Sequence, residues 1–455
     1  MKLIKNKISL LILSSTIVTC AHATDVFRLE GFGSISKAMG GTATAYDVGP
    51  AGMMSNPATL SLMKEGTQFL IGVDIIVTDI YTRNLSTGEK ASSLSNSQNR
   101  GPYSIPQLAI TYRTGKYTVG IGVFGQGGIG TEYGNSSFLS QATGGLDTNL
   151  DVSSRLFVLN IPFAISYQFN EKLTIGASID ATWQGLNLNL LLGADQLGSL
   201  IQDGRVSGSM LPTLGEFPDL RGAHIGFTEN KPVSNGISSW GVTAKMGLTY
   251  KIQKNTTLGM SYSTEGYMKD MTGDATLTVV DAVAGQVPVN GDVRVKDFKL
   301  PANITIGISH KISPDWMITS DFSRVFWENA MKDIDITYSS EMGQLGILLP
   351  QNYSDISIWS VGTNYHYQDW EFRAGYRTAT TGLNNKTLAP TIPALPTKHL
   401  TAGFAYNFSK YSTLDFAYSY GFDGKMKNTS LPMTPVPIEA SNTLNDFSIS
   451  YTRNF

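Results

Sequence analysis

The sequence predicts an all-β transmembrane protein, an antiparallel β-barrel of roughly 14 strands in a bacterial outer membrane. Three observations support this prediction: an export signal at the start of the chain, alternation of apolar and polar residues from Thr67 onward, and a last strand that ends at the aromatic residue Phe455. A barrel wall has one face toward lipid and one toward its lumen, so its mean hydropathy is near neutral. The value for this chain, −0.06, agrees with that expectation.

Residues 1–23 have the features of a cleaved secretory signal. Lysines near the start precede a short apolar run over 8–18, and a small-residue A-x-A site ends at Ala23. The run is shorter than the ~20 residues that a membrane-spanning helix needs. The sole cysteine, Cys20, lies within this signal, and the residues before it do not fit a lipoprotein site well. We therefore expect a mature chain without a thiol, a disulfide or a thiolate metal site.

The composition argues against several classes of protein. Only 15% of the 455 residues are charged, the net charge is −2 and no basic cluster is present, so we expect no nucleic-acid partner. The sequence contains no G-x-S-x-G motif, and its few histidines are not spaced with carboxylates as metal ligands are. We expect no enzymatic activity, no metal and no cofactor.

The barrel is expected over 67–455, and each of its strands carries apolar residues on one face and small or polar residues on the other. Phe163, Ile165 and Tyr167, for example, alternate with Ala164 and Ser166. Short turns alternate with long loops, as in barrels that have periplasmic turns and extracellular loops. The predicted strands are 67–82, 104–114, 117–127, 150–169, 173–190, 238–252, 256–272, 298–312, 315–330, 354–368, 370–381, 398–409, 412–424 and 442–455.

Two segments do not fit a plain barrel. Residues 24–66 precede the first strand and are rich in Gly, Ala and Ser, so they form either a disordered leader or a compact plug in the lumen. The long loop over 186–238 begins with a cluster of leucines. An exposed leucine cluster is unusual unless it meets lipid or an apolar ligand.

Several motifs along the chain resemble those of the FadL/TodX family of outer-membrane transporters for long-chain fatty acids and other hydrophobic compounds. The resemblance begins in the N-terminal segment, with Gly31-Phe32-Gly33, Lys37-Ala38-Met39-Gly40-Gly41 and Asn56-Pro57-Ala58. It continues through Gly128-Ile129-Gly130-Thr131-Glu132-Tyr133, Pro314-Asp315-Trp316 and Asp369-Trp370-Glu371-Phe372, and so covers essentially the whole mature chain. It implies a barrel plugged by an N-terminal hatch over 24–66.

The resemblance also implies a kink in the third strand that opens a hole in the barrel wall, through which ligand leaves sideways into the membrane. The third strand here ends in a glycine-rich stretch, and glycine allows bulges and close backbone approach. Gly128 looks most like the kink glycine of the family, although an ordinary loop after the strand is the alternative. The hatch tripeptide is expected to abut this kink, or else simply to start a turn. The candidate kink residues are Gly125, Gly127, Gly128 and Gly130, and the hatch residues are Asn56, Pro57 and Ala58.

The leucine-rich loop is the candidate for an entrance groove between extracellular loops. Its alternative is a short amphipathic helix over 194–201 that merely packs over the barrel mouth. The second wall of the groove is expected to come from the next loop, around Val280. The candidate ligand-binding residues are Leu190, Leu192, Leu197, Leu200, Ile201 and Val280.

The stretch 185–190, where relatives that carry fatty acids tend to have basic residues, contains no charge. A buried carboxylate without a cation or several donors is costly. We therefore expect a neutral hydrocarbon or aromatic ligand rather than a long-chain fatty acid, unless the carboxylate meets a cation elsewhere. The possible cations are Arg155, Lys245, Arg324, Arg373 and Arg377.

The expected function is transport of hydrophobic molecules, long-chain fatty acids or hydrocarbons, across the outer membrane. We expect passive diffusion, since no energy-coupling motif is visible. The alternatives are a general porin for small polar solutes, whose lumen would be ringed with charge, and a surface adhesin that acts through its loops. The expected partners are outer-membrane lipid and lipopolysaccharide, and the barrel-assembly machinery, for which Phe455 would be the assembly signal. We expect a monomer.

Overall fold

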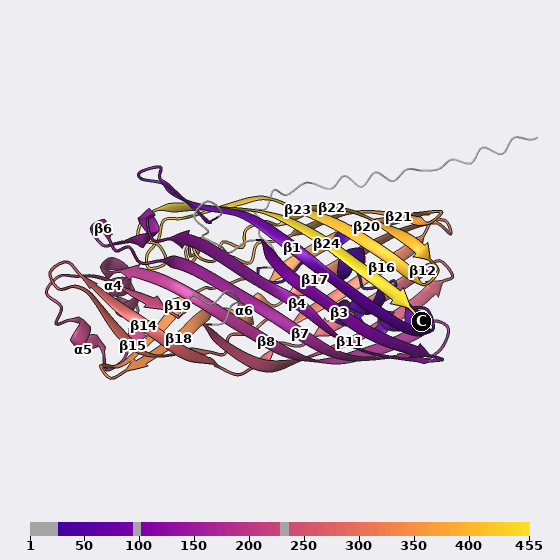
Figure 1. Ribbon diagram of the computed structural model, residues 1–455, viewed down its shortest axis with the longest axis horizontal. Helices are drawn as coiled ribbons and strands as arrows, with labels where there is room; N and C mark the ends of the chain where they lie inside the picture. Colours follow the sequence, from indigo (N-terminus) through magenta and orange to yellow (C-terminus); the bar gives the residue numbers. More distant parts are fainter. Residues whose placement is uncertain (1–25, 94–101, 228–235) are drawn as a thin grey trace, which may run out of the picture.

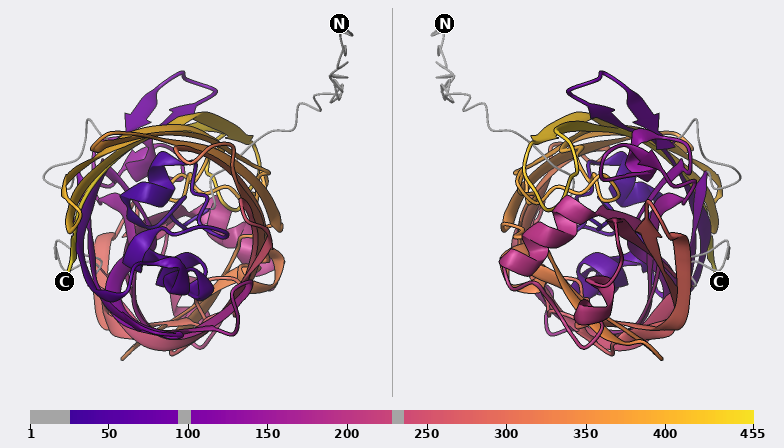
Figure 2. Two further views of the ribbon diagram at one scale, coloured as in Figure 1. Left: turned by 90° about the vertical axis from the view of Figure 1, so that its right-hand side faces the viewer. Right: turned by 90° about the vertical axis from the view of Figure 1, so that its left-hand side faces the viewer.

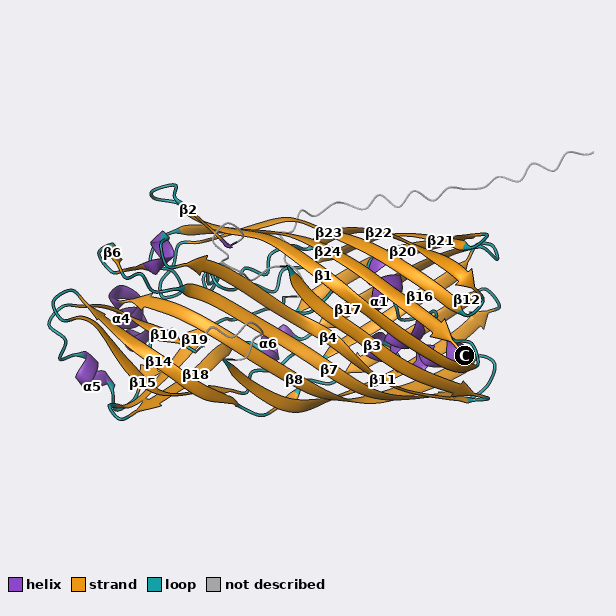
Figure 3. Ribbon diagram, in the orientation of Figure 1, coloured by secondary structure: helices purple, strands orange, loops and turns teal. Residues whose placement is uncertain are grey.

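In the computed structural model, residues 26–93, 102–227 and 236–455 are described, and they form a tall barrel of tilted antiparallel strands (Figures 1 and 3). The predicted signal, 1–23, lies outside the described residues. None of the helices in the described part of the chain is long and apolar enough to cross a membrane.

The long strands of the wall follow one another in chain order, and β24 pairs with β1 to close the ring. They are β1 (Gly66–Asn84), β3 (Tyr103–Thr114), β4 (Tyr117–Gly134), β7 (Val152–Gln168), β8 (Leu173–Gly193), β11 (Ile237–Gln253), β12 (Thr256–Ser263), β16 (Asn303–Lys311), β17 (Trp316–Val325), β20 (Ile356–Tyr367), β21 (Trp370–Ala379), β22 (Lys398–Ser409), β23 (Ser412–Asn428) and β24 (Ile438–Asn454).

The expected number of strands, 14, is corrected to a closed circuit of 16, because two further strands enter the wall. β10 (Leu220–Gly226) pairs with the end of β8, β14 (Met271–Asp281) pairs with β10, and β14 meets β11 at Ser238 and Thr272. Nearer the opposite end of the barrel, β8 pairs directly with β11. The expected strand 256–272 is wrong in its second half, since β12 ends at Ser263 and β14 begins at Met271.

Hairpins and short helices build up the end of the barrel that carries the long loops, on the left in Figure 1. The strands there and in the remaining loops are β2 (Lys90–Ser92), β5 (Gln141–Ala142), β6 (Leu146–Asp147), β9 (Val206–Ser207), β13 (Tyr267–Met268), β15 (Gly285–Lys296), β18 (Asp333–Ser340) and β19 (Gly343–Pro350). The helices are η3 (Phe138–Ser140), α4 (Ala194–Gln202), α5 (Leu211–Leu214) and α6 (Trp327–Ala330).

The alternation along the wall strands separates a lipid-type exterior from a polar lumen. Phe163 and Ile165 are about half exposed, whereas Ser166, on the other face, is buried inside the ring. The same inversion holds in β24, where Phe447 and Ile449 point outward and Ser448 is buried. Large apolar side chains on the outside and small polar ones inside are typical of an outer-membrane barrel.

The N-terminal residues run through the inside of the ring (Figure 2). Their four short helices are α1 (Gly33–Ala38), η1 (Gly49–Ala51), α2 (Gly52–Ser55) and η2 (Pro57–Leu62). Lys37 of α1 forms ion pairs with Asp74 of β1, at 2.9 Å, and with Asp446 of β24. All three side chains are almost fully buried, so α1 is held to the wall where the ring closes.

Candidate binding site for a hydrophobic ligand

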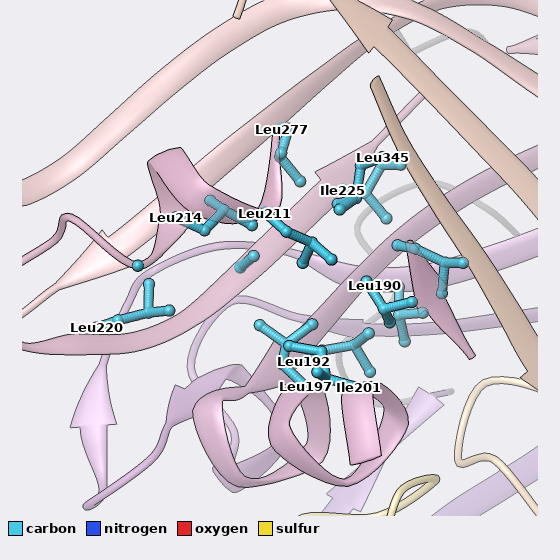
Figure 4. A pocket seen from close by; sticks show the side chains of 14 residues that line it. Leu190, Leu192, Leu197, Ile201, Leu211, Leu214, Leu220, Ile225, Leu277 and Leu345 are labelled. Atoms are coloured by element: carbon cyan, nitrogen blue, oxygen red, sulfur yellow. The ribbon is translucent and has the colours of Figure 1, made fainter. Parts of the chain in front are cut away.

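An apolar cavity of about 160 Å³ lies among the extracellular-type loops (Figure 4). It is lined by the end of β8, by α4 and α5, and by strands β9, β10, β14 and β19. In Figure 4, Leu197 and Ile201 of α4 point toward Leu190 and Leu192 from one side of this outer cavity. The lining residues are Leu190, Leu192, Leu197, Ile201, Val206, Leu211, Leu214, Gly215, Leu220, Ala223, Ile225, Leu277, Leu345 and Ile347.

The sequence of α4 explains its place in the outer cavity. Gln196 accepts a hydrogen bond from the Gly193 N–H at 3.0 Å and donates one to the Pro432 carbonyl at 2.6 Å, which fixes the start of the helix. Leu197 and Ile201, four residues apart, then lie on one face of the helix. That face lines the cavity.

The six candidate groove residues do not all meet in one place. Leu190, Leu192, Leu197 and Ile201 line the outer cavity. Leu200, on α4 as well, is fully buried in the packed core, and Val280 lies in a separate apolar cluster with Tyr133. The strand that forms the other wall contributes Leu277 in place of Val280.

A second apolar cavity, of about 50 Å³, shares Leu190 and Leu192 with the first. Ser154, Gln351 and Thr391 are the polar side chains among its described lining residues, and none of the described residues around either cavity is charged. The lining of this inner cavity is Phe27, Ile129, Ser154, Leu156, Leu186, Leu188, Leu190, Leu192, Phe298, Ile334, Ile336, Leu349, Gln351, Ala389, Thr391, Ile392 and Met433.

Aromatic side chains pack around Phe27, which lines the inner cavity together with Phe298. The Phe27 ring makes an edge contact with Trp327 at 5.6 Å between centroids and lies 6.1 Å from Tyr353 and 6.3 Å from Phe298. Such arrangements are favourable beyond the area that they bury. These four residues could not be singled out in the sequence, because they come from separate segments with no common motif.

The four candidate kink glycines lie within β4, on both sides of a register shift between Gly125 and Gly127. β4 pairs with β3 only as far as Phe124, although its pairing with β7 continues to Gly134. Beyond Phe124, the N-terminal segment pairs with β4 instead: Gly128 N–H donates to the Phe27 carbonyl at 2.8 Å. Among the residues that the structure describes, the hydrogen-bonded wall is thus interrupted between β3 and β4 beyond Phe124.

Close backbone approach accounts for two of these glycines. A Cβ atom at Gly127 would overlap the Phe27 carbonyl, and one at Gly128 would lie 2.6 Å from the Leu156 carbonyl oxygen. Ile129, the next residue of β4, lines the inner cavity. The interruption in the wall therefore adjoins that cavity.

Asn56 holds the N-terminal segment to β11 rather than to the bulge in β4, which is the register shift between Gly125 and Gly127. Its amide donates to the Leu248 carbonyl at 3.1 Å and to the Thr44 carbonyl at 2.7 Å, and its Oδ1 accepts from the Ala58 N–H. Pro57 and Ala58 then begin η2. The residues of the N-terminal segment that pair with β4 beside this register shift are Phe27 to Leu29.

The five possible cations for a ligand carboxylate line neither apolar cavity and interact elsewhere. Lys245 forms an ion pair with Asp180, Arg324 with Asp355, and Arg373 with Asp415 and Glu371. Arg155 lies over the Tyr103 ring, and Arg377 donates to the Ser360 hydroxyl. Lys245 and Arg377 line a polar cavity beside Glu30 and Asp321.

Phe455 follows the last wall strand. Its backbone N–H donates to the Thr67 carbonyl at 2.9 Å, which extends the pairing of β24 with β1. The residue is 72% exposed. The packing of the folded barrel therefore depends little on this side chain.

Residues 12–455 match a protein family described as "Outer membrane protein transport protein (OMPP1/FadL/TodX)". The chain is 38% identical to TodX, the toluene transporter of Pseudomonas putida, with a TM-score of 0.84 over 94% of this chain and 99% of TodX. It is 41% identical to the Ralstonia pickettii toluene transporter TbuX, with a TM-score of 0.80 over 94% and 99% of the two chains. The long-chain fatty acid transport protein of Escherichia coli K12 is 22% identical over 412 residues, 87% of each chain.

Proposed function

Because the chain belongs to the OMPP1/FadL/TodX family of outer membrane transport proteins, we propose that it carries small neutral hydrocarbons across the bacterial outer membrane by passive diffusion. The protein is an outer-membrane barrel, and its family consists of membrane transporters of hydrophobic compounds rather than enzymes. The observation that carries the proposal is the pair of apolar cavities that share Leu190 and Leu192.

The proposed route starts at the outer cavity and passes Leu190 and Leu192 into the inner one. From there the ligand would leave sideways, next to Ile129, where β4 separates from β3. Each step keeps an apolar ligand in apolar surroundings, so that no step requires its transfer into water. The N-terminal hatch, 24–66, with Asn56, Pro57 and Ala58 at β11, would close the direct path through the lumen.

The chemistry of the cavities favours a neutral ligand over a fatty acid. None of the described residues that line them carries a positive charge, and burial of a carboxylate without a cation is strongly unfavourable. The outer cavity, about 160 Å³, is close in size to an engineered Leu/Ile/Phe-lined cavity of about 150 Å³ that binds benzene. The similarity to TodX and TbuX, both described as toluene transporters, supports a monoaromatic ligand.

Other proposed partners follow from the place of a barrel in its membrane. Outer-membrane lipid and lipopolysaccharide would surround the apolar exterior, and the protein would act as a monomer. The barrel-assembly machinery would read the terminal strand, with Phe455 as its signal.

Uptake of labelled compounds tests the proposal. The protein is expressed in a bacterium that lacks its own transporters of this family, and uptake of toluene and of oleate is measured beside an empty-vector control. We expect faster toluene uptake and no change for oleate. Restored oleate uptake without toluene uptake would assign the protein to fatty acids and overturn the neutral ligand.

A further inference from the structure

A proline-rich segment, 388–396, enters the barrel between β21 and β22 and is buried along almost its whole length. Loops normally run over the surface, because a buried loop has backbone polar groups that need partners. Pro390, Pro393 and Pro396 reduce this need, since proline has no N–H, and they also restrict the backbone. The carbonyl groups of the segment still require donors.

Wall strands supply those donors. Five side chains from β4, β7, β23 and β24, each at most 5% exposed, donate hydrogen bonds to four carbonyls of the segment. Tyr133 donates to Pro390 at 2.8 Å, Thr131 and Ser154 to Thr391 at 3.0 and 2.6 Å, Asn428 to Leu388 at 2.9 Å, and Asn442 to Pro393 at 2.9 Å. The segment is thus fixed from several sides.

The wall is also shaped around the segment. β23 has a register shift between Gly421 and Gly424, and a Cβ atom at Gly424 would overlap the Leu395 backbone. Displacement of the segment would break these buried hydrogen bonds and this close backbone contact.

The segment forms part of the inner cavity through Ala389, Thr391 and Ile392. Ile392 has the largest side chain of the three, and it is less buried than its neighbours in the segment because it borders the cavity. We infer that the segment 388–396 is a rigid wall that sets the largest ligand the inner cavity admits, and that Ile392 is the size-determining residue. This inference rests on the proposed function and adds a limit on ligand size at the inner cavity, which has about 50 Å³ against about 160 Å³ for the outer one.

The test compares uptake of naphthalene, with two rings, with uptake of toluene, with one. Ile392→Ala enlarges the cavity without removing a hydrogen bond to the segment, so we expect the naphthalene-to-toluene uptake ratio to rise by about tenfold. Ile449→Ala, the same change on the lipid-facing side of β24, should leave the ratio unchanged. An unchanged ratio in correctly assembled Ile392→Ala protein would overturn the role of Ile392.

A second variant tests the rigidity of the wall. Tyr133→Phe removes the hydroxyl that donates to Pro390 and that also lies 3.0 Å from the Thr82 hydroxyl. We expect it to raise the same ratio, by less than Ile392→Ala, and Thr82→Val, which removes only the contact with Thr82, should leave the ratio unchanged. Equal ratios in Tyr133→Phe and wild type would show that this bond does not hold the wall.

Failure of the proposed function has a different signature, since wild-type cells would then take up no toluene. Binding of both compounds to purified wild-type and Ile392→Ala protein would in that case decide the size limit, and an unchanged preference would overturn it.

Discussion

Two leucines, Leu190 and Leu192, border both apolar cavities and so join the two parts of the proposed route. Their apolar character was visible in the sequence, because a leucine cluster in a long loop is unusual unless it meets lipid or an apolar ligand. The sequence could not distinguish Leu200, which packs into the core, from Leu197, which lines the outer cavity. Phe27 could not be found either, since only contacts across the barrel bring it to the cavity.

A polar side chain of similar size at Leu192 should obstruct the route. Leu192→Asn places an amide without partners between the two cavities, at a cost of roughly 1–3 kcal/mol, so we expect toluene uptake to fall by about tenfold. Leu192→Met keeps an apolar side chain of similar volume and should retain most of the uptake. Equal uptake by the two variants, at equal surface levels, would remove Leu192 from the route.

Among the elements, wall strands were predictable because contact with lipid on one side and a polar lumen on the other imposes strict alternation. The extra hairpins in the loops were not predicted, because their sequences show no clear alternation. In β14, Leu277 to Asp281 are all buried by other loops, so the run shows no alternation. β18 does alternate, with Ile334, Ile336 and Tyr338 buried, but its acidic residues obscure this signal in the sequence.

The bulge in β4, at the register shift between Gly125 and Gly127, can be tested by substitution of Gly128. A β-branched residue at Gly128 would press on the Leu156 backbone and shift β4 against β7. We therefore expect Gly128→Val to slow toluene uptake severalfold and to leave binding at the outer cavity intact, since that cavity contains no residue of β4. Binding to purified protein and uptake by cells are measured on the same variant, and normal uptake would exclude the bulge from the exit.

For the whole molecule, the question is whether the N-terminal segment closes the barrel. The resemblance to the family implied a hatch, but its attachment through Lys37 could not be read from the sequence, because Asp74 and Asp446 lie far away along the chain. Lys37 is the cation between two buried carboxylates, so its loss leaves Asp74 and Asp446 without their counter-charge. Removal of one member of a buried ion pair typically costs about 3–5 kcal/mol.

This arrangement predicts a leak when the attachment is broken. In planar bilayers, Lys37→Met should raise the ion conductance of the barrel, because a loosened α1 opens the lumen, and deletion of 26–62 should raise it further. Lys64→Met, which removes an exposed lysine of the same segment, serves as the matched control and should resemble wild type. A general porin is already open, so it would conduct in the wild-type form and change little after the deletion. That result would overturn the plugged transporter and, with it, the need for a lateral exit.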